Sequence, residues 1–187
     1  DQDGCEDCSS GAYDVADDGV DADGDGNCDL GDVDIELHAG ANSVSFFALP
    51  ADGDYSIDNI FGDDGTVSKV FGEGVVAYDH PTAGWIGALT DVEADDGYWA
   101  VLVQDYTLQV QGLPTAPVSY AVHTGNNFLS YAYGNGQLLS DALPSSATDN
   151  TLYIYGEGVS ALNVNGDWIG YTKSPNEMIK LVKKYPT

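Results

Sequence analysis

Gly72-Glu73-Gly74-Val75-Val76-Ala77 recurs 84 residues later as Gly156-Glu157-Gly158-Val159-Ser160-Ala161. The chain on either side of this stretch is repeated at nearly the same offset. Upstream, His38-Ala39-Gly40-Ala41-Asn42 matches His123-Thr124-Gly125-Asn126-Asn127, and Ser45-Phe46 matches Ser130-Tyr131; downstream, Trp85-Ile86-Gly87 matches Trp168-Ile169-Gly170. Four matches in one order at a near-constant spacing indicate an internal duplication.

Both copies consist of short apolar or aromatic runs broken by Gly, Asn, Asp and Pro, which is typical of strands joined by turns. The predicted strands are Asn42–Leu49, Val67–Phe71, Tyr98–Val103, Tyr106–Val110, Val118–His123, Phe128–Tyr133 and Leu152–Tyr155. Short helical turns are expected at Ser56–Phe61 and Leu138–Leu143. The predicted fold class is all-β, as two small barrels or a two-domain sandwich.

Three units are expected along the chain. Residues 1–34 form an Asp-rich segment, residues 35–116 the first copy of the β-module, and residues 117–187 the second copy with a basic C-terminal strand. Pro114 and Pro117 bracket the junction of the two copies.

The Asp-rich segment contains a calcium-loop pattern between Asp21 and Asp32. Oxygen ligands fall at loop positions 1, 3, 5, 9 and 12, Gly26 permits the sharp turn at position 6, and position 7 supplies a backbone carbonyl. The predicted ligands are Asp21, Asp23, Asp25, Asn27, Asp29 and Asp32. Hard oxygen ligands at this density favour Ca2+ over transition metals.

Two departures from the EF-hand pattern matter. Position 12 is Asp32 instead of Glu, so its shorter side chain predicts a modest affinity. The following residues, Val33 to Leu37, alternate apolar and acidic, which indicates a strand and not an exit helix. A dockerin, which needs loop-helix pairs, is therefore disfavoured.

The carboxylates upstream of Asp21 have looser spacing, and with the loop they resemble the type 3 repeats of thrombospondin and their bacterial relatives. This resemblance implies Asp-rich turns wrapped around several calcium ions, with few regular elements. It adds as ligands of further ions Asp1, Asp3, Asp7, Asp14 and Asp17. The alternative for this stretch is a solvated acidic linker.

Cys5, Cys8 and Cys28 all lie in the acidic segment, where apolar residues are too few to make a core. We expect a disulfide between Cys8 and Cys28, leaving the partner of the third thiol open. A zinc site is the alternative, and it lacks two further soft ligands nearby.

The modules also resemble a secreted bacterial β-repeat with a Gly-Glu-Gly middle, a Trp-x-Gly turn and a Gly-Tyr-Trp end, here Gly97-Tyr98-Trp99. That repeat belongs to cell-surface and extracellular multidomain proteins and implies no catalysis.

Charge excludes several classes of function. Thirty-one Asp and Glu against five Lys and no Arg give a net charge of -26, which argues against binding nucleic acid or anionic membranes. No run of 18 apolar residues occurs, so we expect no membrane insertion. Bound divalent cations or high external salt would offset the repulsion, and both indicate an extracellular or cell-surface protein.

The C-terminal end is basic, with four of the five lysines from residue 173 onward. One hypothesis is that the segment Met178, Ile179, Lys180, Leu181 and Val182 adds as a strand to a neighbouring subunit and links monomers into a fibre. The alternative is an edge strand kept soluble by its lysines.

The duplicated His38 and His123 and the duplicated Glu73 and Glu157 are interpreted as structural, because a catalytic histidine needs a partner that the sequence does not name. The motifs of hydrolases, nucleotide-binding proteins and zinc proteases are missing from the sequence, so an enzyme is not expected. Repeated aromatics, including Trp85, Trp99 and Trp168, indicate core packing more than a sugar-stacking face.

The sequence thus predicts an extracellular, calcium-stabilised structural or adhesive protein, with self-association into a fibre or surface layer, or contact with a cell-surface or other extracellular partner. The first alternative is a carbohydrate-binding accessory module of a larger secreted protein, with polysaccharide as its ligand. The second is a halophilic enzyme whose acidity is salt adaptation.

Overall fold

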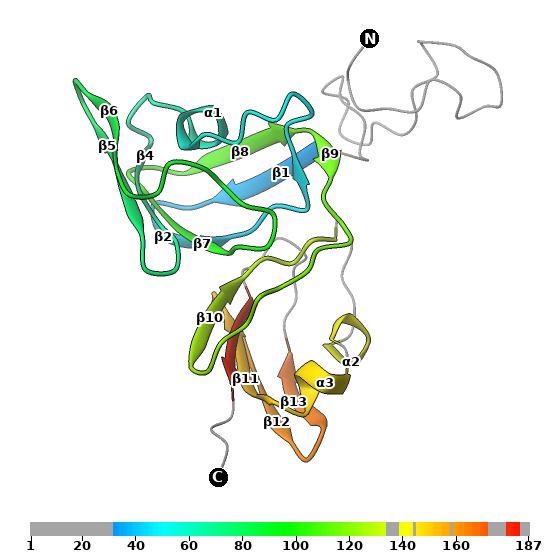
Figure 1. Cartoon of the computed structure of the whole chain (residues 1–187). Coiled ribbons are helices and arrows are strands. Elements are labelled where there is room, and N and C mark those ends of the chain that lie inside the picture. Colours follow the sequence, from blue (N-terminus) through cyan, green and yellow to red (C-terminus); the bar gives the residue numbers. More distant parts are fainter. Residues whose placement is uncertain (1–31, 134–138, 144, 158, 172–178, 184–187) are drawn as a thin grey trace, which may run out of the picture.

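A computed structural model of the chain describes residues 32–133, 139–143, 145–157, 159–171 and 179–183 (Figure 1). It confirms the all-β prediction: strands dominate, and the helices α1 (Ile57–Phe61), α2 (Leu139–Ala142) and α3 (Ser145–Thr148) are each a turn or so long. The first two lie where helical turns were predicted.

The first module is built on a five-stranded antiparallel sheet with the order β2-β7-β4-β5-β6. Its strands are β2 (Gly40–Val44), β4 (Val67–Phe71), β5 (Val76–His80), β6 (Gly84–Gly87) and β7 (Tyr98–Leu102). Two strand pairs accompany it: β1 (Asp32–Leu37) with β8 (Tyr106–Gln111), and β3 (Ala48–Leu49) with β9 (Leu113–Pro114).

The second module repeats this sheet with the order β10-β14-β11-β12-β13. Its strands are β10 (Asn126–Leu129), β11 (Thr151–Gly156), β12 (Val159–Val164), β13 (Asp167–Tyr171) and β14 (Ile179–Lys183). Position by position, β10 corresponds to β2, β14 to β7, and β11 to β13 correspond to β4 to β6. The duplicated motifs therefore occupy equivalent places in two copies of one sheet.

The Trp-x-Gly motif has a steric cause that is the same in both modules. Gly87 pairs with Ala77, and Gly170 pairs with Ala161, across the two equivalent hairpins. A Cβ on Gly87 would lie 2.1 Å from the Val76 carbonyl oxygen, and one on Gly170 would lie 2.3 Å from that of Ser160. Only glycine allows the strands to approach this closely.

The hydrophobic core of the first module is continuous and includes residues from β1, β2, β4, β7, β8 and α1. Phe46 is fully buried and packs edge-to-face on Phe61. Alternate residues of the β1–β8 pair, Ile35, Leu37, Leu108 and Val110, point into this core and are at most 6% exposed. In the described part of the second module, the buried cluster contains Leu129 and Ile154, with Leu139, Leu143 and Trp168 packed against it.

Two predicted elements differ from the structure. Residues 118–123, predicted as a strand, take part in no strand pairing that the described residues show. The segment Ile179–Lys183, expected to be a terminal strand with a free edge, is β14 and is hydrogen-bonded to β10 on one side and β11 on the other. Both edges are thus used within the chain, so this strand has no edge left for a neighbouring subunit; Met178 lies outside the described residues.

Candidate functional site: the contact between the two modules

Each module presents a glutamate at the tip of a hairpin. In the β4–β5 hairpin, the Gly72 N–H donates to the Val75 carbonyl at 3.0 Å, which leaves Glu73 and Gly74 at the turn. Gly74 has a φ of 74°, a conformation that glycine adopts without strain. In the β11–β12 hairpin, Gly156 pairs with Val159, which places Glu157 at the equivalent tip.

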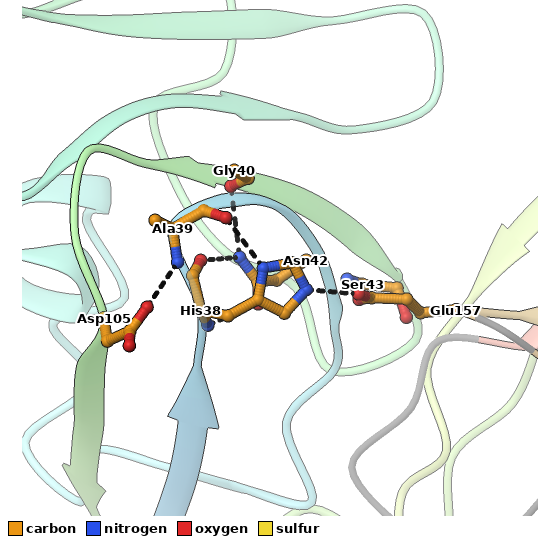
Figure 2. Close-up of polar contacts among 7 residues, drawn as sticks. All are labelled: His38, Ala39, Gly40, Asn42, Ser43, Asp105 and Glu157. Atoms are coloured by element: carbon orange, nitrogen blue, oxygen red, sulfur yellow. Dashed lines mark hydrogen bonds and ion pairs between the residues drawn. The ribbon is translucent and has the colours of Figure 1, made fainter.

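Each module also presents a histidine on a rigid loop that leads into its edge strand. The Asn42 side chain accepts a hydrogen bond from the His38 N–H at 2.8 Å and donates to the carbonyls of His38 and Gly40 (Figure 2). The Ala39 N–H donates to Asp105 at 2.8 Å, which ties the loop to the start of β8. The backbone of the His-x-Gly-x-Asn motif is therefore held by a buried amide.

The second copy builds the same loop. Asn127 accepts from the His123 N–H at 2.8 Å and donates to the carbonyls of His123 and Gly125. Both asparagines are buried, with exposures of 3% for Asn42 and 2% for Asn127. The invariant part of the motif is thus structural, as the sequence indicated.

The glutamate of each module binds the histidine loop of the other. His38 Nε2 lies 2.6 Å from Oε1 of Glu157, and Oε2 of Glu157 accepts the Ser43 N–H at 2.8 Å (Figure 2). Reciprocally, His123 Nε2 contacts Oε1 of Glu73, and Oε2 of Glu73 accepts the Phe128 N–H at 2.7 Å. We call these two equivalent contacts the clasps; they relate the modules as a self-complementary pair.

The clasps also cover two sheet edges. Ser43 lies in β2 and Phe128 in β10, and each of these strands is the first in its five-stranded sheet. An edge strand exposes unpaired N–H groups that can recruit another chain. Each glutamate satisfies one of these donors, so the clasps join the modules and protect their edges together.

Further contacts lie beside the clasps. Asp96 forms an isolated bridge with Leu129. The Gly97 N–H donates to the Phe128 carbonyl at 3.4 Å, and the Ser130 N–H donates to the Asp95 carbonyl at 3.0 Å. The loop before β7 therefore adds to β10 and extends the contact between the modules.

The electrostatics favour a charged pair at the first clasp. His38 Nδ1 lies 2.8 Å from the Ala39 carbonyl, which accepts its proton, and Nε2 faces the Glu157 carboxylate. The Ala39 carbonyl, followed by Glu157 and Asp105, raises the pKa of His38 above its ordinary value. The imidazolium donates at both nitrogens, as this geometry requires.

Beside the second clasp, near Glu73, burial disfavours the charged form of a carboxylate, that of Asp96. Desolvation, followed by the charges of Asp95, Glu93 and Glu73, raises the pKa of Asp96 to about 6. Ionised Asp96 therefore destabilises the folded state at neutral pH.

This arrangement binds and positions but is not built for proton transfer. Both ring nitrogens of His38 are engaged, one by a carbonyl and one by a carboxylate. A general base needs a free nitrogen within reach of a substrate proton. The sequence interpretation of the histidines and glutamates as structural agrees with these contacts, although their pairing across the modules was not predicted.

Two of the three tryptophans pack against the cores. Trp85 packs against the first core and donates from Nε1 to the Gly62 carbonyl at 2.7 Å, and Trp168 packs against the second core. The described tryptophans are partly buried, and none is among the large exposed apolar residues.

The predicted calcium ligands and the predicted disulfide fall outside the described residues, with the exception of Asp32. The backbone of Asp32 begins β1 and pairs with Gln111. Among the residues that the structure describes, no group of three or more His, Cys, Asp or Glu side chains is arranged to hold a metal ion. No helix in the described ranges is long and apolar enough to cross a membrane.

Comparison of the chain with protein-family models, with curated proteins and with solved structures gave no match.

Proposed function

We propose that this chain is an extracellular, calcium-stabilised structural or adhesive protein whose two β-modules act as one mechanical unit. The reciprocal clasps carry the proposal. The histidine and the glutamate that are duplicated in both copies join the copies. Each glutamate binds the histidine and an edge-strand N–H of the other module. A protein in which two histidines and two glutamates join the modules is suited to bear load or to space other groups.

The Asp-rich segment supports the calcium part of the proposal through its sequence alone. Ions that bind only the folded segment stabilise it by mass action, and they neutralise carboxylates in a chain of net charge -26. Halophilic adaptation predicts a response to bulk salt instead. Trp85 and Trp168 give no support to a sugar-binding role, because both rings pack against the cores and the Trp85 Nε1–H donates to the Gly62 carbonyl.

The test is thermal unfolding and light scattering in calcium and then in excess EGTA, at constant ionic strength. We expect chelation to lower the unfolding temperature and to reduce the particle size of any assembly. A matched variant, Asp21→Asn with Asp23→Asn, should show the EGTA behaviour in the presence of calcium, while Asp52→Asn, an exposed turn residue, should not. An unfolding temperature that follows salt and ignores calcium would contradict the proposal.

A further inference from the structure

The first five-stranded sheet has an apolar and aromatic outer face. Alternate residues of its strands point away from the core. Among them, Ile86 pairs with Tyr78, and Tyr78 pairs with Lys69, in a row that crosses three strands. Tyr78 and Ile86 are 44% and 46% exposed, and Phe71, beside Lys69 on β4, is 38% exposed. Large apolar side chains that face solvent together on one sheet are the features of a binding surface.

The second sheet repeats this outer face. Ile169 pairs with Leu162, and Leu162 pairs with Tyr153, in the same places as the row of the first sheet. Tyr153 is 44% exposed and Ile169 is 61% exposed, whereas Ile154, the neighbour of Tyr153 on β11, points to the other side and is fully buried. The exposed apolar row is therefore duplicated with the modules.

The two outer faces lie on the same side of the molecule where the sheets meet. Residues 96–98 connect the sheets, because Asp96 bridges to Leu129 of β10 and Tyr98, two residues on, pairs with Val44 of β2 (Figure 1). Residues two apart on an extended chain, and residues opposite each other in a bridge, point to the same side. Leu129 belongs to the second core and Tyr98 and Val44 to the first. Both cores thus lie on one side of this connection and both outer faces on the other.

Acidic residues are scarce in these strands. Of the 31 Asp and Glu in the chain, the ten strands of the two sheets contain two, whereas they contain three of the five lysines. Asp79 pairs with Trp85, which packs against the core. Asp167 begins β13, at the hairpin that ends the second sheet. The outer faces are therefore far less acidic than the rest of the chain.

Lys69 lies among the aromatic rings of the first face. Its Nζ is 5.8 Å from the centroid of the Phe71 ring and 5.2 Å from that of Tyr78. Ring faces attract a cation at such distances. In the part of the chain that the structure describes, the ion pairs are those of the clasps, so no carboxylate neutralises this ammonium. Lys69 therefore presents hydrogen-bond donors in the middle of an apolar surface.

Charge narrows the class of partner for this surface. A chain of net charge -26 repels nucleic acid and anionic lipid. A cationic partner needs carboxylates, and a second copy presents the same lysines, so neither finds complementary charge here. An uncharged partner remains. Neighbouring strands lie about 4.8 Å apart, so ten of them offer a surface on the order of 40 Å long, which suits a polymer.

Sugar polymers have the matching chemistry. The C–H groups on one face of a sugar ring pack on aromatic rings as other apolar groups do. The hydroxyl oxygens around its rim accept hydrogen bonds from ammonium and phenol groups. Chains of β-1,4-linked sugars are extended and flat, as the surface of a sheet requires.

We propose that the outer faces of the two sheets bind an uncharged, β-1,4-linked polysaccharide that lies across both modules. Its sugar rings pack on Phe71, Tyr78 and Tyr153, and Lys69 donates to its hydroxyl groups. This inference rests on the adhesive part of the proposed function and supplies its ligand. It does not involve Trp85 or Trp168, which pack against the cores.

The experiment is affinity electrophoresis of the full chain in native gels that contain hydroxyethyl cellulose, with calcium present. We expect the polymer to retard the protein, and carboxymethyl cellulose, which has the same backbone with negative charges, to retard it much less. Tyr78→Ala and Tyr153→Ala should each weaken binding roughly tenfold, the loss expected for one stacked ring. Tyr106→Ala is the matched control, because Tyr106 is 38% exposed and lies on β8, outside the two sheets.

A second measurement needs no substitution and covers the case of a misfolded variant. In calorimetric titration of the unsubstituted chain, cellohexaose should bind at least tenfold more tightly than cellobiose, because the longer chain reaches more of the surface. Absence of retardation by hydroxyethyl cellulose, or equal retardation of Tyr78→Ala and Tyr106→Ala, overturns the proposal. A Tyr78→Ala variant that changes the sedimentation of the protein and not its retardation would identify the face as a contact between copies, and this also overturns it.

The same samples separate this inference from the proposed function. If EGTA lowers the unfolding temperature but hydroxyethyl cellulose does not retard the protein, the polysaccharide proposal fails and the calcium-stabilised structural role stands. If the polymer retards the protein but unfolding ignores calcium, the binding face stands and the calcium part of the proposed function fails.

Discussion

The Nε2 atom of His38 lies 2.6 Å from Oε1 of Glu157, although 119 residues separate them in the chain. The equivalent residues His123 and Glu73 make the same contact with the roles of the modules exchanged. All four side chains are partly exposed, so screening by solvent limits what the charges alone contribute to stability. The specific effect of the clasps is that each carboxylate also holds an edge-strand N–H of the opposite module.

Removing one glutamate should therefore expose one amide and leave the other protected. We expect Glu157→Ala to accelerate hydrogen exchange at Ser43 and not at Phe128, and Glu73→Ala to do the reverse, because the two carboxylates accept from these two different N–H groups. Exchange monitored by NMR at single residues is the measurement. Glu36→Ala, which removes a contact within one module to Thr107, serves as the control. Equal effects of the two clasp variants on both amides would contradict two independent clasps.

The first clasp should weaken as pH rises above neutrality. The pKa of His38 is raised in the folded protein by the Ala39 carbonyl, followed by Glu157. A raised histidine pKa contributes stability that is fully present below the unfolded value of about 6.5 and is lost as pH rises through the folded value. The difference in unfolding temperature between the wild type and His38→Gln should thus be larger at pH 6 than at pH 8.5. A difference that does not vary between these pH values would show that His38 is not protonated in the clasp.

Local sequence predicted the strands whose partners lie nearby. Val67–Phe71 was predicted with the bounds of β4, and Tyr106–Val110 differs from β8 by one residue. Alternation of apolar and polar residues identifies a half-buried strand without reference to the rest of the fold. The same alternation at residues 118–123 predicted a strand that the structure does not contain, because a strand also requires a partner and alternation does not supply one.

The clasps could be anticipated only in part. His38 and Glu73 each recur at the equivalent position of the second copy, and this duplication is what the sequence analysis interpreted as a structural role. Their partners could not be read from the sequence, because each residue contacts the non-equivalent motif of the other copy. A signal was present nonetheless: a histidine and a glutamate repeated in both copies are complementary in charge and form two identical pairs.

The position of β14 shows another limit of local interpretation. Its lysines indicated an exposed strand, since lysine is common on sheet edges. Alignment of strand order with the first module places it second in the sheet, between two other strands, where β7 lies in the first copy. The corresponding residues of the two strands differ too much for the repeat to be recognised from sequence at this point.

Neutralising Asp96 should stabilise the protein at neutral pH. Burial and the neighbouring carboxylates raise the pKa of Asp96 to about 6, so the folded state binds its proton more tightly than the unfolded state does. That contribution is present below pH 3.8 and is lost as pH rises through about 6. Asp96→Asn should therefore raise the unfolding temperature at pH 7.5 and have little effect at pH 4. The neighbouring Asp95→Asn is the matched control, and equal stabilisation by both variants would indicate a general charge effect.

The buried asparagines of the histidine loops should contribute more to stability than any single exposed polar residue. Asn42 is 3% exposed and makes three hydrogen bonds to the backbone of its own loop. Truncation leaves those backbone groups without partners, which costs about 1–3 kcal/mol of the free energy of unfolding. Asn42→Ala and Asn127→Ala should each show this loss in urea unfolding followed by tryptophan fluorescence. Asn59→Ala, which removes one exposed hydrogen bond to the Asp54 carbonyl, should change stability by less than about 0.5 kcal/mol. A loss for Asn42→Ala no larger than for Asn59→Ala would mean that the loop holds its shape without the amide, and the histidine would then be positioned by Glu157 and Asp105 alone.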